Sequence, residues 1–218
     1  MKSLTLACAL ALGLGLPFAG TTAPAMPAMQ AVPQAAAAPA APKLHAALRG
    51  LWHGHIVHTR AYAMAVKAGN QAAATKAAGD VVANAKQIAN AVAGFYGADA
   101  GKGMLKLLAG HWAGVKALTD AGHAGDEAAS DKAMQDLSAN AGEIAKFLHG
   151  ANPDHWPEAT VQGLLLEHVA DHHAQIGEIM GDDSAAEAQT WARMQEHMNM
   201  IADALASGIA AQFPAKVQ

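Results

Sequence analysis

From Lys43 onward, apolar and polar residues alternate in the pattern of amphipathic helices. Ala, Leu, Met, Lys and Gln dominate this part of the chain, and apolar residues recur at spacings of three and four. Glycine or proline with a nearby Asn or Asp interrupts the pattern at five places, where one helix ends and the next is capped. The pattern predicts six helices, over residues 44–67, 71–96, 99–121, 127–149, 156–180 and 184–212.

Equivalent positions in these helices recur 56 and 57 residues apart. The histidines, the polar residues of the returning helices and the capping residues all follow these offsets. The three sets are His55, His111 and His168; Asn84, Asn140 and His197; and Asn70, Asp126 and Asp183. Because apolar positions follow the same offsets, we predict an all-α, six-helix bundle built from three repeated helical hairpins.

The spacing within each predicted hairpin places its polar residues at one depth. The histidine lies 15 residues before the capping residue, and the polar residue of the second helix lies 14 residues after it. At a rise of about 1.5 Å per residue, both lie about 21 Å from the turn. All of these residues continue the apolar stripe of their helix, so we expect one polar layer inside the core.

A buried layer of histidine and asparagine is unstable unless its polar atoms find partners. A closed hydrogen-bond network would supply them, and so would a metal ion, for which imidazole is the commonest nitrogen ligand. His55, His111 and His168 would offer three imidazoles from three separate helices, and His197 a fourth. Convergence of several buried histidines favours the metal ion.

Two further residues are candidate ligands. Glu143 lies one turn from Asn140 and is the nearest carboxylate, either as a ligand or as a hydrogen-bond partner of one. His172 follows His168 by four residues, a spacing at which two imidazoles on one helix can bind one ion, and it is the secondary candidate. Other histidines at helix ends or off the stripe are expected to face solvent or to cap carbonyls: His45, His53, His123, His149 and His155.

The residues leave the metal and the activity open. Three imidazoles with water suit Zn²⁺, nearby Met198 and Met200 would suit copper, and Glu143 would admit iron or manganese. We therefore expect a divalent transition metal ion, Zn, Cu, Fe or Mn. Storage, sensing or delivery of the metal is the leading hypothesis. The alternatives are a metal-dependent oxidative or hydrolytic enzyme with an open coordination position, or a structural or partner-binding bundle whose polar layer only sets the register.

The N-terminal part predicts export. Residues 1–25 combine a positive start, a short apolar run and a small-residue cleavage site, which are the features of a secretory signal peptide. Residues 26–42 are rich in proline and alanine and are expected to form a linker, and residues 43–218 the helical-bundle domain. The only cysteine, Cys8, lies in the signal segment, so the exported domain would have neither disulfides nor thiolate ligands. We expect a periplasmic or secreted protein.

Charge and motifs exclude several classes of function. The net charge is −4 and no basic cluster occurs, which argues against nucleic acid and anionic membrane surfaces as partners. After signal removal no remaining segment is apolar and long enough to cross a bilayer. Neither a haem-attachment motif nor a phosphate loop or nucleophile elbow occurs. The metal ion is the expected partner, and the sequence names no protein partner.

Four strings carry a family resemblance: LRGLWHGHIVHTR, LLAGHW, NAGEIAKFLHGANPDHWP and ADALASGIAAQFP. They resemble a largely uncharacterised bacterial family of histidine-containing helix-bundle proteins, over about residues 48–214. The shared residues are His55, Thr59, Arg60, His111, His168, His197 and the Gln-Phe-Pro ending at 212–214. Many members have an acidic residue where Gln87 stands, and some are labelled transferases, for which this chain shows no sugar-nucleotide chemistry.

A shorter resemblance concerns the segment HVADHHAQI, residues 168–176. It resembles the H-x-x-x-H segment of DinB-like metal-binding helical proteins, which use three histidines, one of them from another helix. The arginine that often follows the histidine pair in those proteins is Ala174 here. This resemblance implies a ligand role for His168 and His172.

Overall fold

A computed structural model describes residues 41–217, which form six α-helices and one short 3-10 helix. The elements are α1 Pro42–Lys67, α2 Gln71–Tyr96, α3 Ala98–Ala124, α4 Glu127–Ala151, α5 Glu158–Met180, α6 Ser184–Gln212 and η1 Pro214–Lys216. The prediction of an all-α fold with six helices is confirmed. The predicted signal peptide and almost all of the predicted linker lie outside the described residues.

The turns within the helix pairs α1–α2, α3–α4 and α5–α6 share one capping arrangement. The side chains of Asn70, Asp126 and Asp183 each accept a hydrogen bond of 3.0 Å from the backbone N–H three residues further on. This satisfies one of the backbone donors that a helix start leaves unpaired. The residue directly before each cap has a positive φ. The φ values are 64° for Gly69, 69° for Gly125 and 60° for Asp182.

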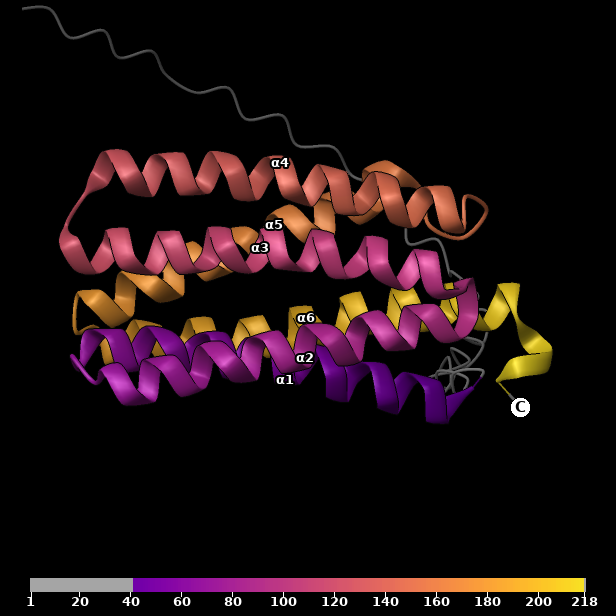
Figure 1. Cartoon of the computed structure of the whole chain (residues 1–218), viewed down its shortest axis with the longest axis horizontal. Coiled ribbons are helices and arrows are strands. Elements are labelled where there is room, and N and C mark those ends of the chain that lie inside the picture. Colours follow the sequence, from indigo (N-terminus) through magenta and orange to yellow (C-terminus); the bar gives the residue numbers. More distant parts are fainter. Residues whose placement is uncertain (1–40, 218) are drawn as a thin grey trace, which may run out of the picture. The chain divides into compact units, whose positions relative to one another are not determined.

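Consecutive helices pack against each other, and α6 returns to α1, so the bundle closes on itself (Figure 1). Two ion pairs join these closing helices: Arg49 on α1 with Asp203 on α6, and Arg60 with Glu187. His45 also contacts Asp203, at 2.8 Å from Nδ1 to Oδ1, and is only 6% exposed. The prediction that His45 faces solvent or caps a carbonyl is therefore wrong.

The helices α1, α3 and α5 also contact one another, so they form the inner set, with α2, α4 and α6 packed between and around them. Buried side chains of α1, α3 and α5 can therefore meet at the axis of the bundle. Those of α2, α4 and α6 lie on one face of each helix and pack against the inner helices. The core is apolar over most of its length, with Ile56, Met104, Leu137 and Met194 almost fully buried. This arrangement decides which polar side chains can meet.

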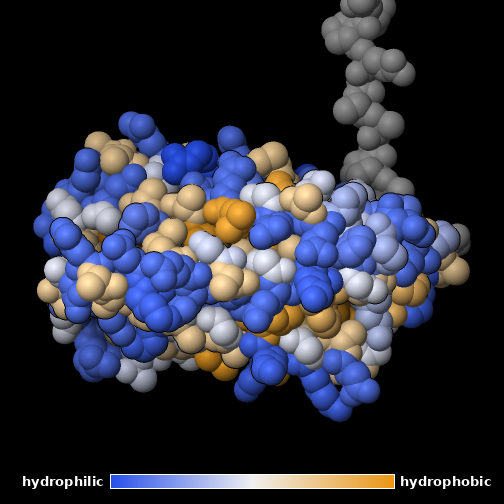
Figure 2. All heavy atoms as spheres, turned by 90° about the horizontal axis from the view of Figure 1, so that it is seen from above, coloured by the Kyte–Doolittle hydropathy of each residue, from blue (hydrophilic) through white to orange (hydrophobic). Residues whose placement is uncertain are grey.

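The face drawn in Figure 2 is mostly hydrophilic, with apolar side chains scattered among polar ones. Such scattered exposure is ordinary for a folded domain. Among residues 41–217, no helix combines the length and the apolarity that a membrane crossing requires.

Candidate metal centre

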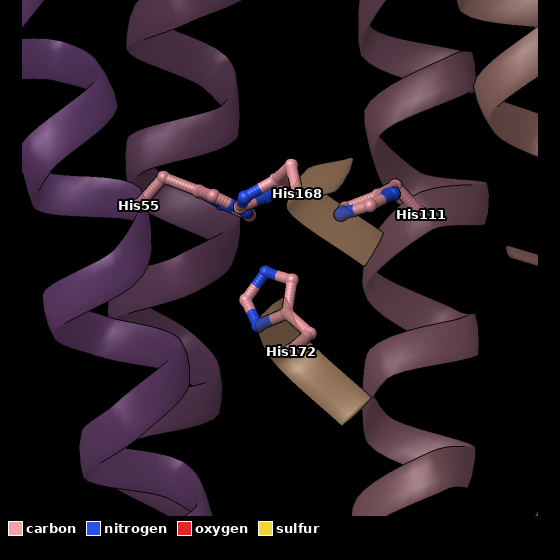
Figure 3. Close-up of side chains that lie close together, drawn as sticks. All are labelled: His55, His111, His168 and His172. Atoms are coloured by element: carbon pink, nitrogen blue, oxygen red, sulfur yellow. The ribbon is translucent and has the colours of Figure 1, made fainter. Parts of the chain in front are cut away.

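Four histidines meet at the axis of the bundle. They come from the inner helices alone: His55 from α1, His111 from α3, and both His168 and His172 from α5. Each offers a ring nitrogen, and these four atoms all lie within 4.8 Å of one another. Figure 3 shows the imidazoles pointing toward one another, with His172 one turn away from the level of the other three.

The arrangement of the four rings resembles a tetrahedron. Five of the six distances between ring centroids lie between 5.5 and 5.8 Å, and the sixth, between His168 and His172, is 4.3 Å. An ion bound tetrahedrally at about 2.1 Å from each nitrogen would hold the centroids about 5 Å apart. A square-planar ion would instead place opposite rings about 6.4 Å apart, with neighbours closer than 5 Å. The rings thus need only a small inward movement to bind one tetrahedral ion.

Burial keeps these imidazoles neutral. The four side chains belong to residues that are 1–5% exposed. Loss of hydration lowers the pKa of His55 to about 3 and that of His111 to about 4. Burial, and then the neighbouring imidazoles, hold the pKa values of His168 and His172 well below the ordinary one. Neutral imidazole is the form that binds a metal ion, so no proton has to be removed at neutral pH.

The histidines do not form a hydrogen-bond network of their own. Within the described residues, both ring nitrogens of His111 and His168 are buried without a hydrogen-bond partner, as are Nε2 of His55 and Nε2 of His172. Leaving a buried polar group without a partner is destabilising by about 1–3 kcal/mol. A transition-metal ion would accept one lone pair from each ring and so remove much of this cost.

His197 lies outside this group, although it was predicted as a ligand. It is 1% exposed, and its Nε2 lies 2.8 Å from the carbonyl oxygen of Leu164. Since a carbonyl only accepts, Nε2 carries the proton and donates it, which removes that nitrogen from metal binding. His197 sits on the outer helix α6, and its imidazole ends at the backbone of α5 before it reaches the axis.

Glu143 is also outside the group. Its side chain is exposed, whereas Ile144, the next residue, is 4% exposed and packs in the core. A residue three positions after Asn140 is rotated by about 300° around the helix, and on α4 this rotation turns it to solvent. Glu143 therefore contributes neither a ligand nor a hydrogen bond to the four imidazoles.

A second polar cluster adjoins the histidines between α5 and α6. Asp171 is 3% exposed and binds Arg193, with 2.9 Å between Oδ1 and Nε. Gln175 donates from Nε2 to Oε1 of Glu187 at 2.9 Å, and Arg60 binds both oxygens of the same carboxylate. The hydrogen bond from Arg60 lowers the pKa of Glu187. These carboxylates are engaged with arginine, so they stabilise the α1–α5–α6 contact rather than join the imidazoles.

The sequence carried a signal for the fourth imidazole. His168 and His172 are separated by four residues, which places both on one face of α5, and their rings come to 4.3 Å. The hairpin offsets pointed elsewhere, because Thr59 and Val115 stand at the positions equivalent to His172. His172, the fourth member of the group, therefore has no histidine at the equivalent positions of the other two helix pairs.

Comparisons with protein-family models, with curated proteins and with solved structures gave no match. The chemistry of the site is therefore read from its own geometry. Four nitrogen donors without a thiolate or carboxylate suit Zn²⁺ and other imidazole-binding transition metals, and suit Mg²⁺, Ca²⁺ or Mn²⁺ poorly.

Proposed function

We propose that this protein binds one divalent transition-metal ion through His55, His111, His168 and His172. The four buried imidazoles whose nitrogens lie within 4.8 Å of one another are the observation that supports it. Unpartnered nitrogens among these rings, in the part of the chain that the structure describes, argue against a polar layer that serves packing alone. One ion would bring the four rings together and satisfy a nitrogen on each.

The tetrahedral arrangement favours Zn²⁺ among the metals that imidazole binds. Zn²⁺ has no geometric preference that would flatten the site, and four nitrogen ligands complete its usual coordination. Copper(II) prefers a tetragonal arrangement, and the ring separations do not approach one. Met200 is 52% exposed, which argues against it as a ligand of a buried ion, and Met198 is buried among the apolar side chains of the core.

A site of four protein ligands holds its ion rather than activating a substrate. Catalytic zinc sites keep one position for water, with three protein ligands, whereas closed sites have four. Because the four histidines are almost fully buried, an ion can reach them only when the helices or side chains move. We therefore propose storage, sensing or delivery of the metal, with slow exchange, rather than hydrolytic or oxidative catalysis.

The proposal extends to the place where the protein works and to its relatives. The N-terminal segment has the features of a secretory signal, so we propose a periplasmic or secreted metal-binding protein. Fractionation of cells that produce the full chain tests this, and retention of uncleaved protein in the cytoplasm would contradict it. The repeated capping by Asn70, Asp126 and Asp183 supports an origin from three hairpins. The resemblance to the bacterial helix-bundle family also stays part of the proposal.

Metal titration of the purified full chain tests the central proposal. After treatment with a chelator, the protein should take up one equivalent of Zn²⁺, and Co²⁺ should give the intense visible bands of a tetrahedral site. His172→Ala should weaken Zn²⁺ binding by about 100-fold or more, because losing a direct ligand exceeds the 10–100-fold loss that outer hydrogen-bond partners cause.

The adjacent histidine supplies a matched control. His173 is exposed on the same helix, so His173→Ala should bind Zn²⁺ as the unmodified chain does. Uptake of no Zn²⁺, Co²⁺ or Cu²⁺ by the folded chain would end the proposal. Equal loss in both variants would move the site away from the four histidines.

A further inference from the structure

The outer helices place one buried polar residue beside each of three inner histidines. We propose that Asn84, Asn140 and His197 are positioning residues, which orient the metal-binding imidazoles by accepting a hydrogen bond from each ring. This inference rests on the proposed metal site and adds to it a second layer of residues with a defined role. None of the three is itself a ligand.

All three residues make the same contact with an inner helix. Each donates a hydrogen bond to the backbone carbonyl four residues before the neighbouring histidine. The bonds are Asn84 Nδ2 to Leu51 O at 2.9 Å, Asn140 Nδ2 to Leu107 O at 3.1 Å, and His197 Nε2 to Leu164 O at 2.8 Å. This bond engages Nδ2 of each asparagine and Nε2 of His197, and leaves Oδ1 or Nδ1 as the acceptor of the side chain.

The remaining atom of each side chain is an acceptor without a partner. Oδ1 of Asn84, Oδ1 of Asn140 and Nδ1 of His197 are all buried and unpartnered within residues 41–217. Three buried acceptors occupy equivalent places, each beside a histidine with at least one unpartnered ring nitrogen. They point to a hydrogen bond that forms when the ring is held by an ion. A histidine that binds a metal through one nitrogen almost always donates from the other.

The bonded carbonyls place these side chains close to the histidines. Each carbonyl lies one helical turn before its histidine, and the side chains of a helix lean toward the preceding turn. The outer residue that reaches this carbonyl therefore lies beside the histidine side chain.

Two glycines make room for the asparagines. A Cβ atom at Gly54 would lie 2.9 Å from Nδ2 of Asn84, and one at Gly110 would lie 3.1 Å from Nδ2 of Asn140. Both glycines directly precede the inner histidine, so the amide can lie against the helix backbone there. Placing the short amide this close is what lets one residue hold the carbonyl and face the ring.

In the third pair, α5–α6, a longer side chain makes the equivalent hydrogen bond. Glu167 stands where the other pairs have glycine, and His197 stands where they have asparagine. An imidazole spans the extra distance, with Nε2 on the Leu164 carbonyl and Nδ1 left as the acceptor. Nδ1 lies 3.6 Å from Oε2 of Glu167, beyond hydrogen-bond distance.

Two substitutions of Asn140 separate positioning from packing. Asn140→Leu removes both the donor and the acceptor, whereas Asn140→Asp removes the donor but keeps an oxygen that can accept from His111. Zn²⁺ affinity should fall about 10–100-fold in Asn140→Leu and stay within about threefold in Asn140→Asp. Both variants lose the bond to Leu107, so urea unfolding of the metal-free chains should show both destabilised.

The outcomes are distinct. Asn90 is exposed on the outer helix α2, and Asn90→Leu should leave Zn²⁺ affinity unchanged as the control. Equal weakening in Asn140→Leu and Asn140→Asp, or no weakening in either, would overturn the positioning role while the metal site stands. Failure of the unmodified chain to bind Zn²⁺ would instead end the proposed function.

A second variant covers the case in which Asn140→Leu does not fold. Replacing both residues, Glu167→Gly with His197→Asn, rebuilds in the third pair the arrangement of the first two. Zn²⁺ affinity should then stay within about threefold, since the acceptor is restored at the same place. A loss of about tenfold or more would contradict the positioning role of His197.

Discussion

The pairs α1–α2 and α3–α4 hold their histidine in one way, and the pair α5–α6 holds its histidine in another. In the first two, glycine precedes the histidine and an asparagine from the outer helix bonds the carbonyl behind it. In the third, Glu167 and His197 take these places, and a second imidazole, His172, follows one turn later. The difference shows where the site gains its fourth donor.

Three inner helices with one histidine each would give only three nitrogens and leave a position for water. Such a set belongs to catalytic zinc sites. The positions one turn further on carry Thr59, Val115 and His172, so only the third pair closes the tetrahedron. In the proposed site, this one difference between the pairs would separate a centre that holds its metal from one that could activate a water molecule.

The largest expected effect is the response of the metal-free chain to acid. Each imidazole of the site has a lowered pKa when folded, whereas in the unfolded chain it titrates near 6.5. Below pH 6.5 the unfolded state therefore binds more protons than the folded state. The free energy of unfolding falls with decreasing pH until the pKa of the folded state is reached. Each histidine contributes about 1.4 kcal/mol per pH unit in this window.

Together the four histidines lower the free energy of unfolding by about 5 kcal/mol for each pH unit. This loss approaches the whole free energy of unfolding of an ordinary domain. Urea unfolding in the presence of a chelator at pH 7.5, 6 and 5 measures this, and unfolding without urea near pH 5 is expected. His172→Val should remove about a quarter of the slope, and His173→Ala none of it. A flat profile between pH 7.5 and 5 would show that these rings are not buried neutral.

The second prediction moves the fourth donor to another pair. Val115 on α3 is 1% exposed and equivalent to His172, so Val115→His should aim an imidazole at the same centre. His172→Val alone should weaken Zn²⁺ binding by about 100-fold or more. The double variant should bind Zn²⁺ at least about tenfold more tightly than His172→Val alone. The smaller valine at position 172 leaves the volume that the new imidazole needs.

Competition with a chelating dye gives both affinities. Val115→His alone, with five imidazoles in the core, serves as the control for overpacking and should be destabilised by about 1–3 kcal/mol. Recovery in the double variant would show that the three pairs are interchangeable at the axis. A double variant that binds as weakly as His172→Val would show that α5 alone can present the fourth ring.

The sequence predicted the depth of the polar residues well because helix rise is nearly constant. His55, His111 and His168 meet as the spacing required. Depth does not say how far a side chain reaches toward the axis, and this depends on whether its helix is inner or outer. The stripe of α6 resembles that of α5, so periodicity could not place His197 beside the Leu164 carbonyl rather than at the centre.

Every helix end was predicted to within three residues, because capping residues and turn glycines act locally. The arrangement of helices in space follows from packing between segments far apart in the chain, for which one sequence carries little direct signal. His172 illustrates the consequence. Its spacing from His168 was visible, but only the inner position of α5 makes that spacing decisive.

The smallest expected effect concerns the glycines that distinguish the first two pairs from the third. Gly110→Ala adds a Cβ 3.1 Å from Nδ2 of Asn140, so the amide must shift by a few tenths of an ångström. Zn²⁺ affinity should fall about tenfold, as for other outer hydrogen-bond partners. Stability should change by less than about 1 kcal/mol, because alanine favours the helix over glycine by 0.5–1 kcal/mol and so offsets the strain.

Two substitutions to alanine make this comparison specific. Glu167→Ala alters the equivalent position of the third pair, where a Cβ already exists, and should leave Zn²⁺ affinity unchanged. Gly50→Ala adds a Cβ on α1 where no atom lies within 4 Å, so it should raise stability by about 0.5–1 kcal/mol without affecting the metal. If Gly110→Ala binds Zn²⁺ as Gly50→Ala does, the close approach of Asn140 to α3 has no part in holding His111. The first two pairs would then differ from the third in packing alone.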